Sequence, residues 1–135
     1  RLKASGTWNT PFEIGTADNK SEWYAYAYAP ILQSFGGDLV NRSNYTSAEG
    51  KLNGTAAREF ASWMRSLVEK GYISSRGGSD TALDFVNNKS GLLYGGIWSM
   101  STFQKYAKDY KDIVAMPLAD FGQFMDRGDD GNMRQ

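Results

Sequence analysis

The chain has 135 residues, a length that suits one folded domain. Hydrophobic residues make up 41% and charged residues 22%, which is typical of a globular protein and excludes a disordered chain. Lys plus Arg equal Asp plus Glu at 15 each, so no net charge attracts a polyanion, and nucleic acid is a poor partner. Cysteine and histidine are absent, which excludes disulfides, thiol nucleophiles, most zinc sites and the usual general base.

Aromatic residues are unusually frequent. The chain contains 4 Trp, 8 Tyr and 7 Phe, more than a core of this size requires, so some rings are expected to be working surfaces. It opens on Arg1 without Met or a signal peptide, and no apolar run approaches the roughly 18 residues that span a bilayer. We therefore expect a piece of a longer protein.

The first predicted element is a short strand after Pro11, because proline denies a helix and the residues beyond it are β-prone. Residues 15–21 are polar and predict a loop. Residues 38–40 predict a short extended piece, and the Ser, Asn and Thr content of residues 41–50 predicts another loop.

An aromatic helix is predicted over residues 22–35. Its alternation of tyrosine and alanine is typical of a strand, but alanine favours a helix and the apolar content continues to a Gly36-Gly37 stop. We expect a break or bend near Pro30. On this helix Trp23 and Tyr26 should share one side, and Tyr24 and Tyr28 another.

The clearest element is an amphipathic helix over residues 53–70. Asn53 is placed as its N-cap and Gly71 as its C-cap, and Trp63 is assigned to the core or its edge. Its apolar residues recur at spacings of three and four: Ala57, Phe60, Ala61, Met64, Leu67 and Val68.

The remaining pattern alternates helices and strands. It predicts a helix over 80–87, a turn over 87–90, a buried strand over 91–94 and a helix over 100–110 that Ser99 or Ser101 caps. A strand over 112–118 closes at Pro117. The order of strands and helices predicts an α/β lobe.

The run Asp-Phe-Val-Asn-Asn-Lys-Ser-Gly-Leu-Leu-Tyr-Gly-Gly-Ile-Trp at residues 84–98 resembles the signature of family 1 extracellular solute-binding proteins, the maltose-binding-protein-like group. In that family a helix ends in Phe and is followed by a Gly-Lys turn and a buried strand. After the strand comes a glycine two residues before a tryptophan. Phe85, Lys89, Gly96 and Trp98 occupy these places. Asn88 stands where the family usually has Gly, and Gly91 where it usually has Ala. Because Asn tolerates the left-handed conformation, we expect the turn to be kept.

The resemblance spans about residues 2–122. It implies a partial second lobe of a two-lobe, type II periplasmic-binding-protein-like fold, followed by a truncated or flexible tail over 123–135. It further implies a bacterial protein that is not an enzyme, is extracellular as a cell-surface lipoprotein or periplasmic, and binds a sugar without a cofactor or metal. The implied partners are the missing first lobe and the permease subunits of an ABC importer.

The candidate site residues are aromatic and follow from the same pattern. Two glycines before Trp98 let the backbone turn sharply and present the indole at the carboxyl end of a strand, where the resemblance implies stacking on the ligand. Backbone amides of the helix after Trp98 can donate to a ligand. The predicted ligand-binding residues are Trp98, Gly96, Glu22, Trp23, Tyr24 and Tyr26.

Other functions remain open from the residues alone. The lobe can bind a polyamine or, through clustered tyrosines, ferric iron. It can also be a carbohydrate-active enzyme with paired carboxylates, Glu13 with Glu22 or Asp80 with Asp84, or an interaction module whose rings lie at a protein interface. Four Asn-x-Ser/Thr triplets arise easily by chance and matter only in a eukaryotic secretory pathway. An Arg127-Gly128-Asp129 triplet and the aspartates near it lack the rest of an integrin-ligand or calcium-loop pattern.

Overall fold

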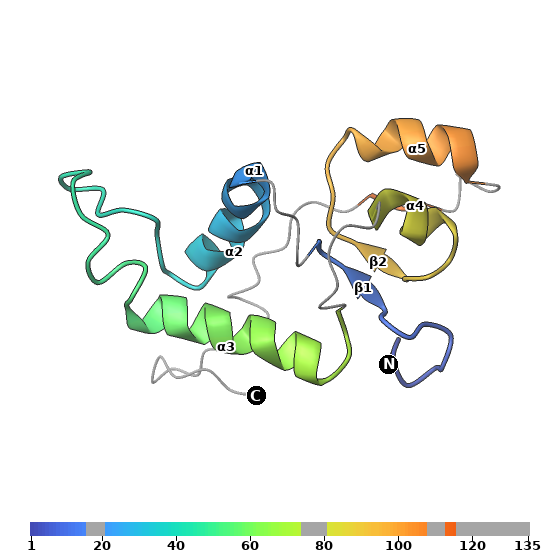
Figure 1. The fold of residues 1–135 in the computed structure, drawn as a ribbon, viewed down its shortest axis with the longest axis horizontal. Coiled ribbons are helices and arrows are strands. Elements are labelled where there is room, and N and C mark those ends of the chain that lie inside the picture. The colour runs from blue at the N-terminus through green and yellow to red at the C-terminus, as the bar shows by residue number, and fades with distance from the viewer. Residues whose placement is uncertain (16–20, 74–80, 108–112, 116–135) are drawn as a thin grey trace. The chain divides into compact units, whose positions relative to one another are not determined.

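The computed structural model describes residues 1–15, 21–73, 81–107 and 113–115 (Figure 1). Within these ranges the elements are β1 (Phe12–Glu13), α1 (Ser21–Trp23), a π-helical turn η1 (Tyr24–Tyr28), α2 (Ala29–Ser34), α3 (Thr55–Glu69), α4 (Thr81–Val86), β2 (Leu92–Leu93) and α5 (Ser99–Tyr106). Helices together with two parallel strands are compatible with the predicted α/β class. None of the described helices is both long and apolar enough to cross a bilayer.

The chain divides into two compact units. The strand unit comprises residues 1–21 and 65–115, and the aromatic unit comprises residues 22–64 and 116–135. Helix α3 contributes residues to both units. The predicted tail over 123–135 lies outside the described residues.

Two short parallel strands form the sheet of the strand unit, with Phe12 opposite Leu92 and Glu13 opposite Leu93. The Phe12 amide also donates to the carbonyl of Tyr72, just after α3, at 3.1 Å. Both strands are therefore confirmed, but the predicted burial of the second is wrong, since Leu92 is 40% exposed. Neighbouring side chains of a strand point to opposite faces, and the face that carries Leu92 is not fully covered.

A left-handed residue ends α4 and starts the turn into β2. Asn88 has φ of 58°, its amide donates to the carbonyl of Phe85 at 2.9 Å, and the Lys89 amide donates to that of Asp84 at 3.0 Å. This pair of hydrogen bonds is a Schellman motif. The expectation that Asn88 keeps the turn is confirmed. Helix α4 packs against β2 and α5, with the rings of Phe85 and Phe103 5.7 Å apart.

The aromatic helix forms, and its irregularity lies in the turn before Pro30. The Ala29 amide donates to the carbonyl of Tyr24 in a π-helical turn, and α2 continues without a break through Pro30. Proline has no N–H to donate and crowds the carbonyl four residues back, so a widened turn before it accommodates the ring. Gly36, with φ of 86°, ends the helix as predicted.

The core of the aromatic unit is formed by the inner side of α2. Ile31, Leu32 and Phe35 are buried, and the Phe35 ring lies 6.1 Å from that of Phe60 and 5.8 Å from that of Trp63. The assignment of Trp63 to the core edge is confirmed, because its side chain is half-buried.

Helix α3 confirms the predicted amphipathic helix at its end but not at its start. Gly71 has φ of 66°, and the Tyr72 amide donates to the Leu67 carbonyl at 2.8 Å, as a glycine C-cap requires. The predicted N-cap, Asn53, is wrong: its side chain accepts from the Gly50 amide at 2.6 Å, and the carbonyl of Gly54 accepts the first helical bond. Of the predicted apolar face, Ala61 and Val68 are exposed.

Two further sequence predictions are not borne out in the described residues. Residues 39 and 40 form a bend instead of an extended piece. The Asp38 carboxylate accepts from the Leu39 amide and from Arg42, and the Arg42 hydrogen bond is the main cause that lowers the pKa of Asp38 to about 2. Residues 113–115 form neither helix nor strand, and the rest of the strand predicted over 112–118 is outside the described ranges.

Replacing Asn88 tests the left-handed turn. Asn88→Ala should lower the free energy of unfolding by about 1–2 kcal/mol, because alanine is strained at this φ and loses a side-chain hydrogen bond. Asn88→Gly should lose less, since glycine adopts the conformation freely. Urea unfolding followed by circular dichroism measures the three stabilities, with Asn87→Ala as the control. Equal losses for alanine and glycine would contradict this account.

Candidate functional site

Trp98 lies in the segment between β2 and α5 with its side chain largely open to solvent. It is 55% exposed, and its neighbour Ile97 is 87% exposed. The segment therefore presents an indole outside the core, at the carboxyl end of a parallel strand.

Gly96 determines where the Trp98 ring lies. A methyl group built on Gly96 would overlap the six-membered ring of Trp98, so the indole folds directly over the glycine backbone. Gly95 is also tight, since a methyl group there would lie 3.2 Å from the Ser99 hydroxyl. Any larger residue at position 96 would displace the indole, which makes Gly96 a positioning residue.

The start of α5 differs from the prediction. Trp98 itself is the N-cap and makes no side-chain cap bond, and Ser101 donates its hydroxyl to the Trp98 carbonyl at 3.0 Å. Neither serine caps the helix. The amides of Ser99 and Met100 already donate to the carbonyls of Gly96 and Ile97, so these two amides, predicted as donors to a ligand, are occupied.

The second predicted group lies on α1 and η1 in the aromatic unit. The rings of Trp23 and Tyr26 are 5.5 Å apart and those of Tyr24 and Tyr28 are 5.6 Å apart, which confirms the two predicted sides of the helix. Tyr24 and Tyr26 are 55% and 42% exposed, and Trp23 is half-buried.

The structure thus brings together the members of each predicted group. Gly96 and Trp98 belong to the strand unit, and Trp23, Tyr24, Tyr26 and the exposed Glu22 belong to the aromatic unit. The three tyrosines divide into two ring pairs, one of which includes Trp23.

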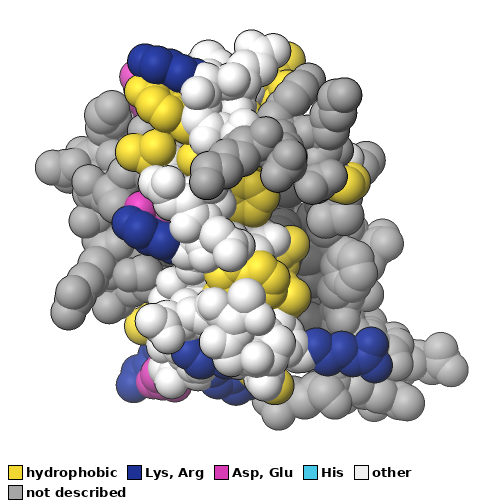
Figure 2. Space-filling view, turned by 90° about the vertical axis from the view of Figure 1, so that its right-hand side faces the viewer, with side chains coloured by type: hydrophobic (Ala, Val, Ile, Leu, Met, Phe, Trp, Pro, Cys, Tyr) yellow, Lys and Arg dark blue, Asp and Glu magenta, His cyan; other side chains and the backbone are white. Residues whose placement is uncertain are grey.

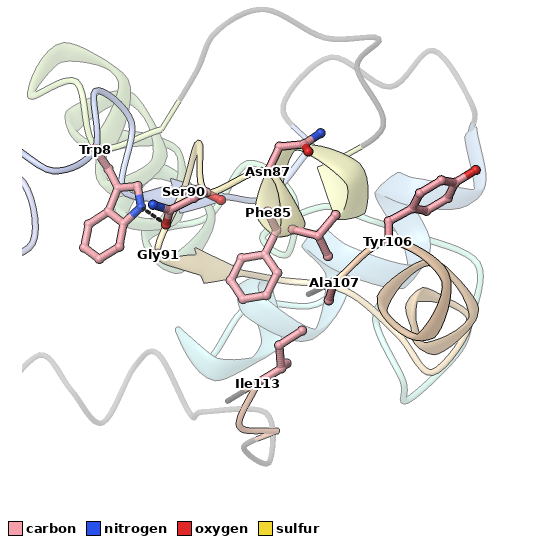
Figure 3. A pocket seen from close by; sticks show the side chains of 10 residues that line it. Trp8, Phe85, Asn87, Ser90, Gly91, Tyr106, Ala107 and Ile113 are labelled. Carbon is pink, nitrogen blue, oxygen red and sulfur yellow. Dashed lines mark hydrogen bonds between the residues drawn. The ribbon is translucent and has the colours of Figure 1, made fainter. Parts of the chain in front are cut away.

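A cavity of about 520 Å³ lies within the strand unit, beside the end of α4 (Figure 3). The described residues of its walls have neutral side chains, partly apolar and partly amide or hydroxyl. They belong to Trp8, Phe85, Val86, Asn87, Asn88, Ser90, Gly91, Tyr106, Ala107 and Ile113.

Trp8 forms one wall of this cavity and holds the N-terminal segment against the turn after α4. Its indole N–H donates to the Asn88 carboxamide oxygen at 3.1 Å. A dashed line from Trp8 marks this bond in Figure 3. A methyl group on Gly91 would come within 3.0 Å of the Trp8 ring. The absence of a side chain at Gly91 therefore gives the indole its place.

Sequence reasoning did not identify the cavity. Ser90 is 2% exposed, and its hydroxyl has no hydrogen-bond partner within the described part of the chain. Gly91 was the one residue that could have indicated the cavity, since the resembled family usually has Ala there and a glycine leaves room for a bulky side chain. Which side chain fills that space cannot be read from the sequence, because Trp8 is about eighty residues away.

Glu13 is a buried carboxyl next to other charges. It is 9% exposed, and burial raises its pKa, as does the negative charge of Asp84, while Lys89 acts in the opposite direction. Lys89 and Asp84 form an ion pair at 2.6 Å. The neighbours Glu13 and Asp84 belong to different predicted catalytic pairs. The predicted partner of Glu13, Glu22, belongs to the other unit, and that of Asp84, Asp80, is outside the described residues.

Charged side chains of both signs are interspersed on the surface. Figure 2 shows Lys and Arg next to Asp and Glu at several places, with hydrophobic side chains exposed in separate patches between uncharged atoms. In the ranges that the structure describes, no three His, Cys, Asp or Glu residues are grouped to hold a metal ion.

Comparison of the chain with protein-family models, curated proteins and solved structures gives no match. The resemblance to the solute-binding family rests on residues 84–98 and the elements around them. The two exposed aromatic groups and the neutral cavity are thus the features from which a function can be argued.

The pH dependence of stability tests the burial of Glu13. Because its pKa is raised, Glu13 binds its proton more tightly in the native state than in the unfolded chain. The free-energy cost of burying the carboxylate is therefore absent below the ordinary pKa of 4.5 and appears as the pH rises through the raised pKa. Relative to wild type, Glu13→Gln should gain stability from pH 4.5 to 7 and show no pH-dependent gain below 4.5.

Urea unfolding at a series of pH values measures this difference. Glu22→Gln, which removes an exposed carboxylate, is the matched control. If the difference in free energy of unfolding between Glu13→Gln and wild type stayed constant across the pH series, it would contradict the burial of a charged group at this position.

Proposed function

We propose that the chain is a sugar-binding lobe of a two-lobe solute-binding protein that serves an ABC importer. The observation that carries the proposal is the exposed indole of Trp98, folded over Gly96 at the end of a parallel strand. The sequence around it, with Phe85, Lys89, Gly96 and Trp98 at the family's positions, supports the same function.

The chemistry of a sugar fits an exposed indole. A pyranose has flat C–H faces that pack on an aromatic ring and hydroxyl groups that need directional hydrogen bonds. Trp98 offers the ring, and its tight packing over Gly96 restricts the motion of that ring before a ligand arrives. A preorganised ring loses less entropy on binding, which favours affinity.

The aromatic helix is the second binding surface of this proposal. Tyr24 and Tyr26 present exposed rings with hydroxyl groups, and Glu22 adds a carboxylate that accepts hydrogen bonds from sugar hydroxyls. In the proposed parent protein the first lobe would close over the sugar and supply the remaining contacts. The chain would then act outside the bacterial cytoplasmic membrane and deliver the sugar to permease subunits, without catalysing a reaction.

Truncating Trp98 tests the proposal directly. In the isolated chain, maltotriose should bind with a Kd on the order of millimolar or weaker, because half of the contacts are missing. Trp98→Ala should weaken that binding roughly tenfold, in line with the loss of one aromatic stack. Two-dimensional NMR of the tryptophan indole signals measures both values.

Ile97→Ala is the matched control, since it removes a neighbouring exposed side chain that has no ring to stack. Gly96→Ala should displace the indole and weaken binding without removing it. Unchanged sugar binding in Trp98→Ala would contradict the proposal, and so would submicromolar binding by the isolated chain. A panel of oligosaccharides incubated with the chain should remain uncleaved, and hydrolysis would favour an enzyme.

A further inference from the structure

We propose that the cavity beside the end of α4 is a second binding site, for a small neutral molecule with a flat apolar ring and an amide or hydroxyl group. This inference does not rest on the proposed function, because none of the cavity's walls belongs to the predicted sugar-binding residues. Its volume of about 520 Å³ falls in the range of small-molecule sites.

The buried hydroxyl of Ser90 is the first observation that points to a ligand. Ser90 lines the cavity, is 2% exposed and makes no hydrogen bond in the described part of the chain. Buried polar groups in native proteins almost always have a partner, because an unpaired one loses its hydrogen bonds to water without compensation. A ligand amide or hydroxyl in the cavity would satisfy Ser90.

The walls determine the remaining chemistry of the ligand. Phe85, Val86 and Ile113 offer apolar surface for a flat ring, and Asn87 contributes a carboxamide that can both donate and accept. The oxygen of the Asn88 carboxamide already accepts from Trp8, so that bond holds the wall in place. Of the side chains labelled in Figure 3, Trp8 comes from the N-terminal segment, Phe85 from α4 and Ile113 from the residues after α5.

The described part of the walls carries no formal charge, which favours a neutral ligand. None of the described residues that line the cavity is Asp, Glu, Lys or Arg. Lys89, which lies between two lining residues in the sequence, is paired with Asp84 at 2.6 Å and is not itself part of the wall. A charged ligand would lose its hydration without gaining a counter-charge.

Nicotinamide and nicotinic acid test this site as a matched pair, because they share one ring and differ in having a neutral amide or a carboxylate. In two-dimensional NMR of the full chain, nicotinamide at about 10 mM should shift the indole signal of Trp8 and the amide signals around Ser90, while the indole signal of Trp98 stays in place. Nicotinic acid should bind at least roughly tenfold more weakly.

Ser90→Ala separates a binding hydroxyl from a structural one. Its thermal midpoint should equal or exceed that of wild type, because an unpaired buried hydroxyl is removed, while nicotinamide affinity should fall roughly fivefold. Ser43→Ala, on an exposed loop of the other unit, is the matched control and should change neither value.

Three results would each overturn the proposal: no shift at Trp8 or Ser90 with nicotinamide, equal binding of the two compounds, or unchanged affinity in Ser90→Ala. Response to maltotriose at Trp98 is read in the same spectra. A failure of this second site and a failure of the sugar-binding proposal are therefore recorded by different signals.

Discussion

The contact between Trp8 and the turn after α4 is the interaction on which the strand unit depends. The indole occupies the space above Gly91 and donates to Asn88, the residue whose left-handed conformation ends α4. Through this contact the N-terminal segment is held where β1 can pair with β2. Two strands of two residues each form few hydrogen bonds, so side-chain packing of this kind has to fix their register.

The same contact produces the cavity. Trp8 closes one side of it, the residues around the Asn88 turn close another, and Tyr106 and Ala107 at the end of α5 add a third. Ser90, whose buried hydroxyl has no hydrogen-bond partner in the described part of the chain, also lines the cavity. The contact that holds the N-terminal segment thus also forms the cavity. The described residues of its walls are neutral, unlike Glu13, Asp84 and Lys89 in the same unit.

Trp98 illustrates a different use of an aromatic residue. Trp8 and Trp63 pack against other parts of their own units, whereas Trp98 packs only closely enough over Gly96 to be oriented and leaves more than half of its surface exposed. An exposed but oriented ring is suited to stack on a ligand face. The high aromatic content of the chain is therefore divided between packing and surface, as its composition indicated.

The sequence by itself determined the local features of this protein. Helix α3, the glycine ends at Gly36 and Gly71, and the left-handed turn at Asn88 were predictable, because helical periodicity and the conformations of Gly and Asn act within a few residues. The position of Gly96 two residues before Trp98 likewise indicated an oriented indole. Only the tertiary structure decided which distant groups meet: Trp8 with Asn88, Glu13 with Asp84, and the hydroxyl of Ser90 with a cavity. Those juxtapositions depend on how elements about seventy to eighty residues apart pack together, and no local pattern encodes that packing.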